Sequence, residues 1–183
     1  MKIFALYADI ALTKKPDWLD GFVAKNNPWG LHVTIKQACY LEDDRVPSIK
    51  EKLSQFFKGR TTLPIAMAFD KVECGRSEDD PIIVLAEKNE EIKMLQGDLC
   101  NLLSEVSNYV DPATENYEKN FRPHITISYG IPESEYQECL DIVKDGCKCE
   151  GVINEIVLSV LGSVTVEEAH NPANKTIYRL TPS

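Results

Sequence analysis

The sequence predicts an α+β fold with two lobes, in which two antiparallel sheets with flanking helices are related by a pseudo-twofold axis around a central cleft. Two observations carry this prediction. The expected elements follow the order strand, helix, strand, helix, strand in residues 2–73 and again in residues 82–161. The middle strand of each half contains the pattern His-x-Thr-x, at His32 and at His124. This order is neither a regular alternation of strands and helices nor a block of strands followed by a block of helices, which favours the α+β class.

The first half of the chain opens with a strand and a helix. Residues 2–9 alternate loosely between apolar and polar side chains, as a half-buried strand does. In residues 13–24, apolar side chains recur at nearly helical spacing. Thr13 could cap the first turn and Pro16 is acceptable within it, so we expect a short amphipathic helix there.

The rest of the first half predicts a strand, a helix and a strand. Residues 31–38 are a β-branched run that follows the turn-forming residues 27–30. Residues 47–57 place their apolar side chains on one side and lead to Gly59, a typical helix end. Residues 62–72 are predicted to form the next strand.

The second half begins with a strand at residues 81–86 and a helix at residues 88–107. The helix has an apolar stripe that we expect to face the core, formed by Ile92, Leu95, Leu99, Leu102, Leu103 and Val106. Residues 107–120 form a polar loop, long enough to be either a functional flap or a disordered connector.

The remaining elements complete one domain. The second His strand is expected at residues 123–129 and a helix at residues 134–144. The last two strands are expected at residues 152–161 and 176–180, with an irregular stretch between them. We expect residues 1–183 to form a single bilobal domain whose lobes exchange strands, because a chain of this length can bury a core without disulfides.

Both His strands carry polar side chains on one face. Because side chains alternate along a strand, the shared faces are His32, Thr34 and Lys36 in the first strand, and Arg122, His124, Thr126 and Ser128 in the second. One such face is typical of the solvent side of an antiparallel sheet. The repetition of His beside Thr instead indicates a site that both halves share, since a pseudo-twofold axis would bring the two strands together.

The composition narrows the class of protein. Asp9 interrupts the apolar N-terminal run, which is too short for a signal peptide, and no stretch approaches the roughly 20 apolar residues of a membrane span. We therefore expect a cytoplasmic, monomeric protein without membrane contact, whose six cysteines are reduced thiols. The net charge of −9 leaves few cations for long nucleic acid, so a nucleotide partner should be small or held by one end.

No metal site is expected. Cys147 and Cys149 are separated by one residue, whereas zinc knuckles use two, and no histidine lies near them in the sequence.

The two His-x-Thr-x motifs, together with Pro123 before the second one and the length of the chain, resemble the two-histidine (2H) phosphoesterase superfamily. This superfamily includes the RNA 2′,3′-cyclic phosphodiesterases, the bacterial 2′-5′ RNA ligase-like proteins and the central domain of the A-kinase anchoring proteins. The resemblance extends over essentially the whole chain. It implies a bilobal α+β fold and metal-independent chemistry with no cofactor.

The motif residues suit the hydrolysis of a phosphodiester. Without a metal, one group must take a proton from the attacking oxygen and another must protonate the leaving oxygen, and histidine can do either near neutral pH. His32 and His124 are therefore predicted to be base and acid, in an order that the sequence leaves open. Thr34 and Thr126 are predicted to donate hydrogen bonds to the non-bridging phosphate oxygens.

Four further residues are candidates for substrate binding. Lys36 and Arg122 share faces with the two pairs and could neutralise phosphate, although a solvated sheet face would also suit them. Trp29 and Tyr129 flank the motifs and could stack on a base, although alternation turns Tyr129 away from His124. His170 lies in a turn-rich loop and is predicted to be a surface histidine without a catalytic role.

The preferred function is a phosphodiesterase that hydrolyses cyclic phosphates or 2′-5′ phosphodiester bonds of RNA ends or small (oligo)nucleotides. Two alternatives remain within the resemblance. One is a hydrolase of cyclic (oligo)nucleotide second messengers, similar to some viral members, and the other is a nucleotide-binding module without turnover. A structural domain whose motifs are coincidental is the remaining reading.

Overall fold

The computed structural model describes residues 1–58, 64–75 and 80–180. Short 3-10 helices lie at Asp43–Arg45 and Pro172–Asn174. The helices are α1 (Leu19–Asn26), α2 (Val46–Lys58), α3 (Glu90–Leu102), α4 (Thr114–Lys119), α5 (Glu133–Val143) and α6 (Val166–His170). The strands are β1 (Lys2–Lys14), β2 (His32–Leu41), β3 (Ile65–Cys74), β4 (Ile82–Ala86), β5 (His124–Ser128), β6 (Cys149–Leu161) and β7 (Lys175–Arg179). The α+β class predicted from the sequence is confirmed.

The strands of the described chain join in one seven-stranded antiparallel sheet, in the order β2-β1-β6-β3-β4-β5 with β7 also paired to β6. The prediction of two separate sheets is therefore wrong. The reason is the length of β6, which pairs with β1 along one edge and divides its other edge between two strands. Residues 149–153 of β6 pair with β3, and residues 155–159 pair with β7.

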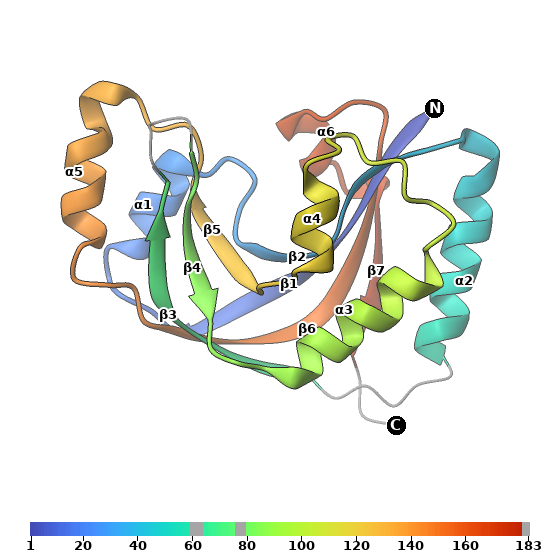
Figure 1. The fold of residues 1–183 in the computed structure, drawn as a ribbon, viewed down its shortest axis with the longest axis horizontal. Helices are drawn as coiled ribbons and strands as arrows, with labels where there is room; N and C mark the ends of the chain where they lie inside the picture. Colours follow the sequence, from blue (N-terminus) through green and yellow to red (C-terminus); the bar gives the residue numbers. More distant parts are fainter. Residues whose placement is uncertain (59–63, 76–79, 181–183) are drawn as a thin grey trace.

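The sheet is strongly curved (Figure 1). In that view α1 and α5 flank β3, β4 and β5 at one end, and α2 lies outside the sheet at the other end. The curvature brings β2 and β5, the strands at the two ends of the main strand order, close to one another. Both strands begin with a motif histidine, so the curvature of the sheet decides where the two histidines lie.

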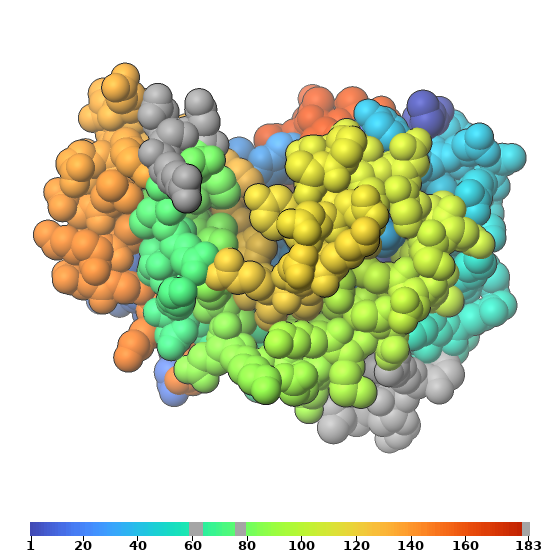
Figure 2. Space-filling view, in the orientation of Figure 1, coloured from blue at the N-terminus to red at the C-terminus, as the bar shows by residue number. Residues whose placement is uncertain are grey.

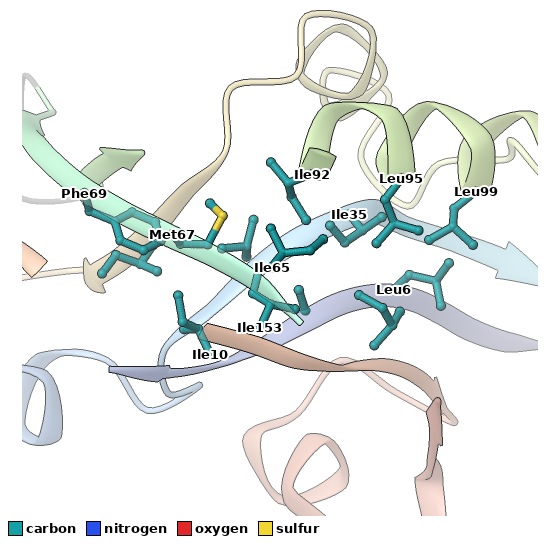
Figure 3. Close-up of a cluster of buried hydrophobic side chains, with 14 of the residues drawn as sticks. Leu6, Ile10, Ile35, Ile65, Met67, Phe69, Ile92, Leu95, Leu99 and Ile153 are labelled. Carbon is teal, nitrogen blue, oxygen red and sulfur yellow. The ribbon is translucent and has the colours of Figure 1, made fainter. Parts of the chain in front are cut away.

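The core packs on the outer side of the curved sheet. Leu6 of β1 and Ile35 of β2 face Leu95 and Leu99 of α3 (Figure 3). Farther along the sheet, the cluster continues through Ile10, Ile65, Met67, Phe69 and Ile153. Full burial of such a side chain contributes about 1.5–3 kcal/mol, so this face supplies much of the stability of the fold. The side chains of the predicted apolar stripe are buried except Leu102, which is partly exposed, although Leu103 and Val106 follow the end of α3.

Several predicted boundaries need correction. The helix expected at residues 13–24 begins only at Leu19, because β1 continues to Lys14, which pairs with Glu150 of β6. Thr13 is therefore a strand residue, and its hydroxyl donates to the Glu150 carbonyl at 3.3 Å. The helix expected at residues 88–107 ends at Leu102.

The other differences concern polar segments. The expected loop at residues 107–120 contains α4, which lies across the middle of the molecular face seen in Figure 2. The irregular stretch between the last two strands contains α6. The helix at residues 47–57 and the strand at residues 62–72 are confirmed, although Gly59 and residues 62–63 lie outside the described residues. No helix in the described part of the chain has the length and apolar character needed to cross a bilayer.

Candidate active site

The two motif strands are joined by hydrogen bonds from the loop that precedes β2. The Asn27 side chain donates from Nδ2 to the Thr126 carbonyl at 2.6 Å. The backbone N–H of Tyr129 donates to the Asn26 carbonyl at 2.8 Å. Asn26 and Asn27 are both buried, so these bonds are protected from water. The start of β2 is thereby held against β5.

Both histidine rings are fixed in the same way. Nδ1 of His32 lies 3.2 Å from the Gly30 carbonyl, and Nδ1 of His124 lies 2.7 Å from the Arg122 carbonyl. Because a carbonyl oxygen only accepts, Nδ1 carries the hydrogen in the neutral ring and Nε2 keeps a free lone pair. Gly30 has a φ of +74°, which a residue with a side chain adopts only with strain, so glycine suits the position that aims its carbonyl at His32.

Pairing with β1 places two further side chains beside the first motif. Tyr7 lies opposite Thr34, and Asp9 lies opposite His32. Directly opposed residues point to the same face, which here is the side of the sheet away from the Leu6 core. We call this side, which carries Tyr7, Asp9, His32 and Thr34, the histidine face. The Tyr7 and His32 rings are 5.1 Å apart between centroids and inclined by 54°.

The second motif lies on the same side of the sheet. Thr126 lies opposite Ile83 and His124 opposite Leu85. Ile125, between them, is fully buried with the outer core, so His124 and Thr126 point to the histidine face. Thr126 is 7% exposed, and the Thr34 and His124 side chains are partly exposed.

The surroundings of His32 favour its neutral form. Burial lowers the pKa of His32 below its usual value of 6.5. The hydrogen bond to Gly30 and the charge of Asp9 oppose this shift, whereas the positive charges of His124 and Lys175 add to it. The His124 charge reaches His32 because the curved sheet brings the two motif strands together. Burial, with a smaller contribution from Asp9, raises the pKa of Tyr7 to about 12, so its phenol stays protonated.

The placement predicted for Lys36 is wrong. The pairing of β1 with β2 shifts between Tyr7 with Thr34 and Leu6 with Lys36, so that Ile35 is an extra residue in β2. After this irregularity, Lys36 shares the face of Leu6, and its side chain is 1% exposed. Its ammonium forms an ion pair with Glu118 at 2.9 Å. The Lys36 charge, a candidate for binding phosphate, is therefore neutralised within the protein.

Glu118 of α4 is the centre of a small polar network. Its carboxylate accepts from the Tyr109 hydroxyl at 2.9 Å and from the Gln37 backbone N–H at 3.0 Å, in addition to Lys36. The Gln96 side chain donates to the Glu118 carbonyl at 3.2 Å. This network docks α4 onto β2 and gives the segment before the second motif a fixed position.

The other binding candidates lie around the two motifs. Arg122 forms an ion pair with Glu73 at 2.7 Å, and Lys71 binds the same carboxylate at 2.9 Å. Trp29 is partly buried in a turn in which its backbone N–H donates to the Asn27 side chain at 3.0 Å. Tyr129 is 40% exposed at the end of β5.

His170 is exposed, and its Nε2 lies 2.8 Å from the Pro28 carbonyl. This contact ties α6 to the loop that leads into His32. Among the residues that the model describes, no group of three or more His, Cys, Asp and Glu side chains is arranged to hold a metal ion.

Sequence reasoning did not identify Tyr7, Asp9, Asn27 or Lys175 as residues of this region. The alternation of residues 2–9 could have placed Tyr7 and Asp9 on one face of β1, but which strand lies beside that face is a property of the folded sheet. Asn27 was seen only as part of a turn.

Comparisons with known proteins concern the family and the fold of this chain. The family model of the 2′-5′ RNA ligase superfamily matches residues 19–163. A solved structure described as a phosphoesterase has a TM-score of 0.50 and 11% identity, covering 100% of this chain and 98% of its own. The structure of E. coli LigT complexed with 3′-AMP has a TM-score of 0.51 and 12% identity, covering 100% of this chain and 96% of its own. No curated protein matches the sequence. At these identities the solved structures show a shared fold.

Proposed function

This chain belongs to the 2′-5′ RNA ligase superfamily of two-histidine phosphoesterases, and from that premise we propose that it is a metal-independent phosphodiesterase. Its substrates in this proposal are cyclic phosphates or 2′-5′ phosphodiester bonds of RNA ends or small (oligo)nucleotides. The observation that carries the proposal is the matched pair of histidines on one face, each with Nδ1 bound to a carbonyl and with Nε2 unbonded to any residue that the structure describes. Two free imidazole nitrogens are what an acid and a base need at a single phosphorus.

The proposed reaction uses His32 as the base. Its lowered pKa keeps the imidazole neutral near pH 7, so Nε2 can take a proton from the attacking water as the oxygen bonds to phosphorus. His124, in its protonated form, gives a proton to the ribose oxygen that leaves when its bond to phosphorus breaks. Thr34 and Thr126 donate to the non-bridging oxygens, where negative charge increases in the transition state.

A small nucleotide fits the charge of the protein. The net charge of −9 disfavours long nucleic acid. The LigT structure, which shares the fold, holds the mononucleotide 3′-AMP. A hydrolase of cyclic second messengers has the same chemistry and differs only in the nucleotide, so one panel of substrates compares the two.

The test is turnover with EDTA present, using 2′,3′-cyclic, 2′-5′-linked and 3′-5′-cyclic nucleotides and mass spectrometry of the products. Because acid and base act together, His32→Ala and His124→Ala should each lower kcat by about 10²- to 10⁴-fold, and the double variant should be little worse than either. His170→Ala is the matched control. It removes the one histidine of the chain that lies outside the two motifs, and it should keep most of the activity.

Three outcomes would contradict the proposal. Activity that EDTA abolishes and added metal restores would overturn the mechanism. Near-normal turnover by either motif variant would remove its histidine from the chemistry. Tight nucleotide binding by the folded protein without turnover of any substrate in the panel would identify a binding module instead.

A further inference from the structure

The cations on the histidine face are held by carboxylates, with one exception in the described chain. Arg179 forms an ion pair with Glu155 at 3.1 Å. Lys71 and Arg122 share Glu73 at the second motif. Lys175, the first residue of β7, forms no ion pair within the part of the chain that the structure describes, although the protein has an excess of acidic groups.

The strand register places Lys175 on the histidine face. It pairs with Ser159 of β6, which pairs in turn with Ala5 of β1. Ala5 shares a face with Tyr7, two residues farther along β1, and Tyr7 is in contact with the His32 ring. The Lys175 side chain is partly buried, and its charge influences His32, whose pKa it helps to lower.

The other face of β7 is occupied by the core. Tyr178 is buried, stacks on Phe57 of α2 with ring centroids 5.0 Å apart, and donates from its hydroxyl to the Lys50 carbonyl. Alternation therefore leaves Lys175 no partner on α2. Removing an ammonium from water without a counter-ion is costly, and this cost is largest beside another cation. The Lys175 ammonium is therefore available to an anion from outside the chain.

We propose that Lys175 is a substrate-binding residue whose ammonium binds the phosphate group on which the two His-x-Thr pairs act. This inference rests on the proposed function and adds to it a cation for the phosphate, a role for which Lys36 and Arg122 were the candidates in the sequence. Lysine suits the role, because its compact charge binds phosphate oxygens without demanding one fixed geometry. The substrate class is thereby narrowed to ligands that place an anionic phosphate within reach of both β2 and β7.

The test compares Lys175→Met, Lys175→Arg and Lys50→Met. Lys50→Met is the matched control, because it removes the same charge from an exposed position. Lys50 lies on α2, which packs on the face of β7 opposite to Lys175. Each protein is titrated with inorganic phosphate while the His32 and His124 imidazole signals are followed by NMR, which requires no turnover. KM and kcat are measured separately with adenosine 2′,3′-cyclic monophosphate.

Lys175→Met should weaken phosphate binding and raise KM by on the order of 10- to 100-fold, the effect of losing a charge-assisted hydrogen bond. Lys175→Arg should recover most of the loss, and Lys50→Met should behave like the wild type. In Lys175→Met without phosphate, the His32 pKa should rise, because one of the positive charges facing it is gone while Asp9, His124 and Tyr7 remain.

Phosphate affinity of Lys175→Met within about twofold of Lys50→Met would overturn the inference, as would a wild type that binds no phosphate saturably. Failure of the proposed function looks different. In that case no nucleotide in the panel is converted, while the phosphate titrations still separate Lys175→Met from its control.

Discussion

His32 and His124 occupy the same motif, yet the fold surrounds His32 with groups that the motif does not specify. Tyr7 lies against its ring, Asp9 faces it from β1 and Lys175 from β7. Burial is the largest influence and lowers its pKa. At the scale of the residue, the neighbours therefore favour the neutral form of the His32 imidazole.

The pH dependence of activity should show this. If His32 is the base, the acidic limb of kcat/KM should have its midpoint below 6.5, because the lowered pKa keeps the ring neutral at more acidic pH. Measurements of kcat/KM for wild type, His32→Ala and His124→Ala between about pH 4 and pH 10 test this midpoint. His32→Ala should lose the acidic limb. A midpoint well above 6.5, or loss of that limb in His124→Ala instead, would reverse the assignment of base and acid.

The same shift affects stability with a definite sign. The folded pKa of His32 lies below the unfolded value, so the unfolded chain binds the proton first as pH falls. The contribution of His32 to stability is complete above about pH 6.5 and is lost as pH falls toward the folded pKa.

What could be predicted at this scale follows from local patterns. The two motifs are visible in the sequence, and each motif histidine is the first residue of a strand, one position later than the predicted strand start. Lys36 was misplaced because one extra residue in β2 reverses the alternation, and no residue type in that strand signals it. Lys175 could not be found, because its position depends on how β7 pairs with β6.

At the scale of elements, the loop before β2 carries much of the geometry. Asn27 donates to Thr126 on β5 and also to the Gly30 carbonyl at 3.1 Å, the carbonyl that orients His32. One buried amide thus connects both motifs. The sequence predicted the strands on either side, but not that a turn residue would join them.

Asn27→Ala should therefore affect stability and activity together. It takes the side-chain donor away from the buried Thr126 carbonyl, at a cost of about 1–3 kcal/mol in the free energy of unfolding. Misalignment of the two histidines should also lower kcat by roughly 10- to 100-fold. Urea denaturation and steady-state kinetics of the folded variant measure both effects.

Asn89→Ala is the control for this prediction. The Asn89 side chain caps α3 by accepting from the Ile92 N–H at 3.1 Å, so its loss should cost about 1 kcal/mol and leave kcat unchanged. Equal kcat values for the two variants would show that Asn27 has only a structural role.

At the scale of the molecule, β1 and β6 run through both halves of the sheet. β3, from the first half of the chain, pairs with β4 and β6 from the second. The repeated order of elements was visible in the sequence, but it suggested separate sheets, because strand pairing between distant segments leaves no local pattern.

Because neither half has a sheet of its own, the protein should unfold as one unit. We expect a single transition in urea, with coincident curves from far-UV circular dichroism and tryptophan fluorescence. Trp18 and Trp29 report on the region around α1 and the first motif. Two separated transitions would indicate that the halves are independent lobes after all.

The buried pair of Lys36 and Glu118, 82 positions apart, also constrains how related sequences can diverge. Loss of either partner leaves an unpaired buried charge, which typically costs about 3–5 kcal/mol, a large part of the stability of a domain. Replacement of both by apolar residues of similar volume can be neutral. Substitutions at positions 36 and 118 should therefore occur together. Homologues aligned over β2 and α4 should carry opposite charges at both positions or at neither.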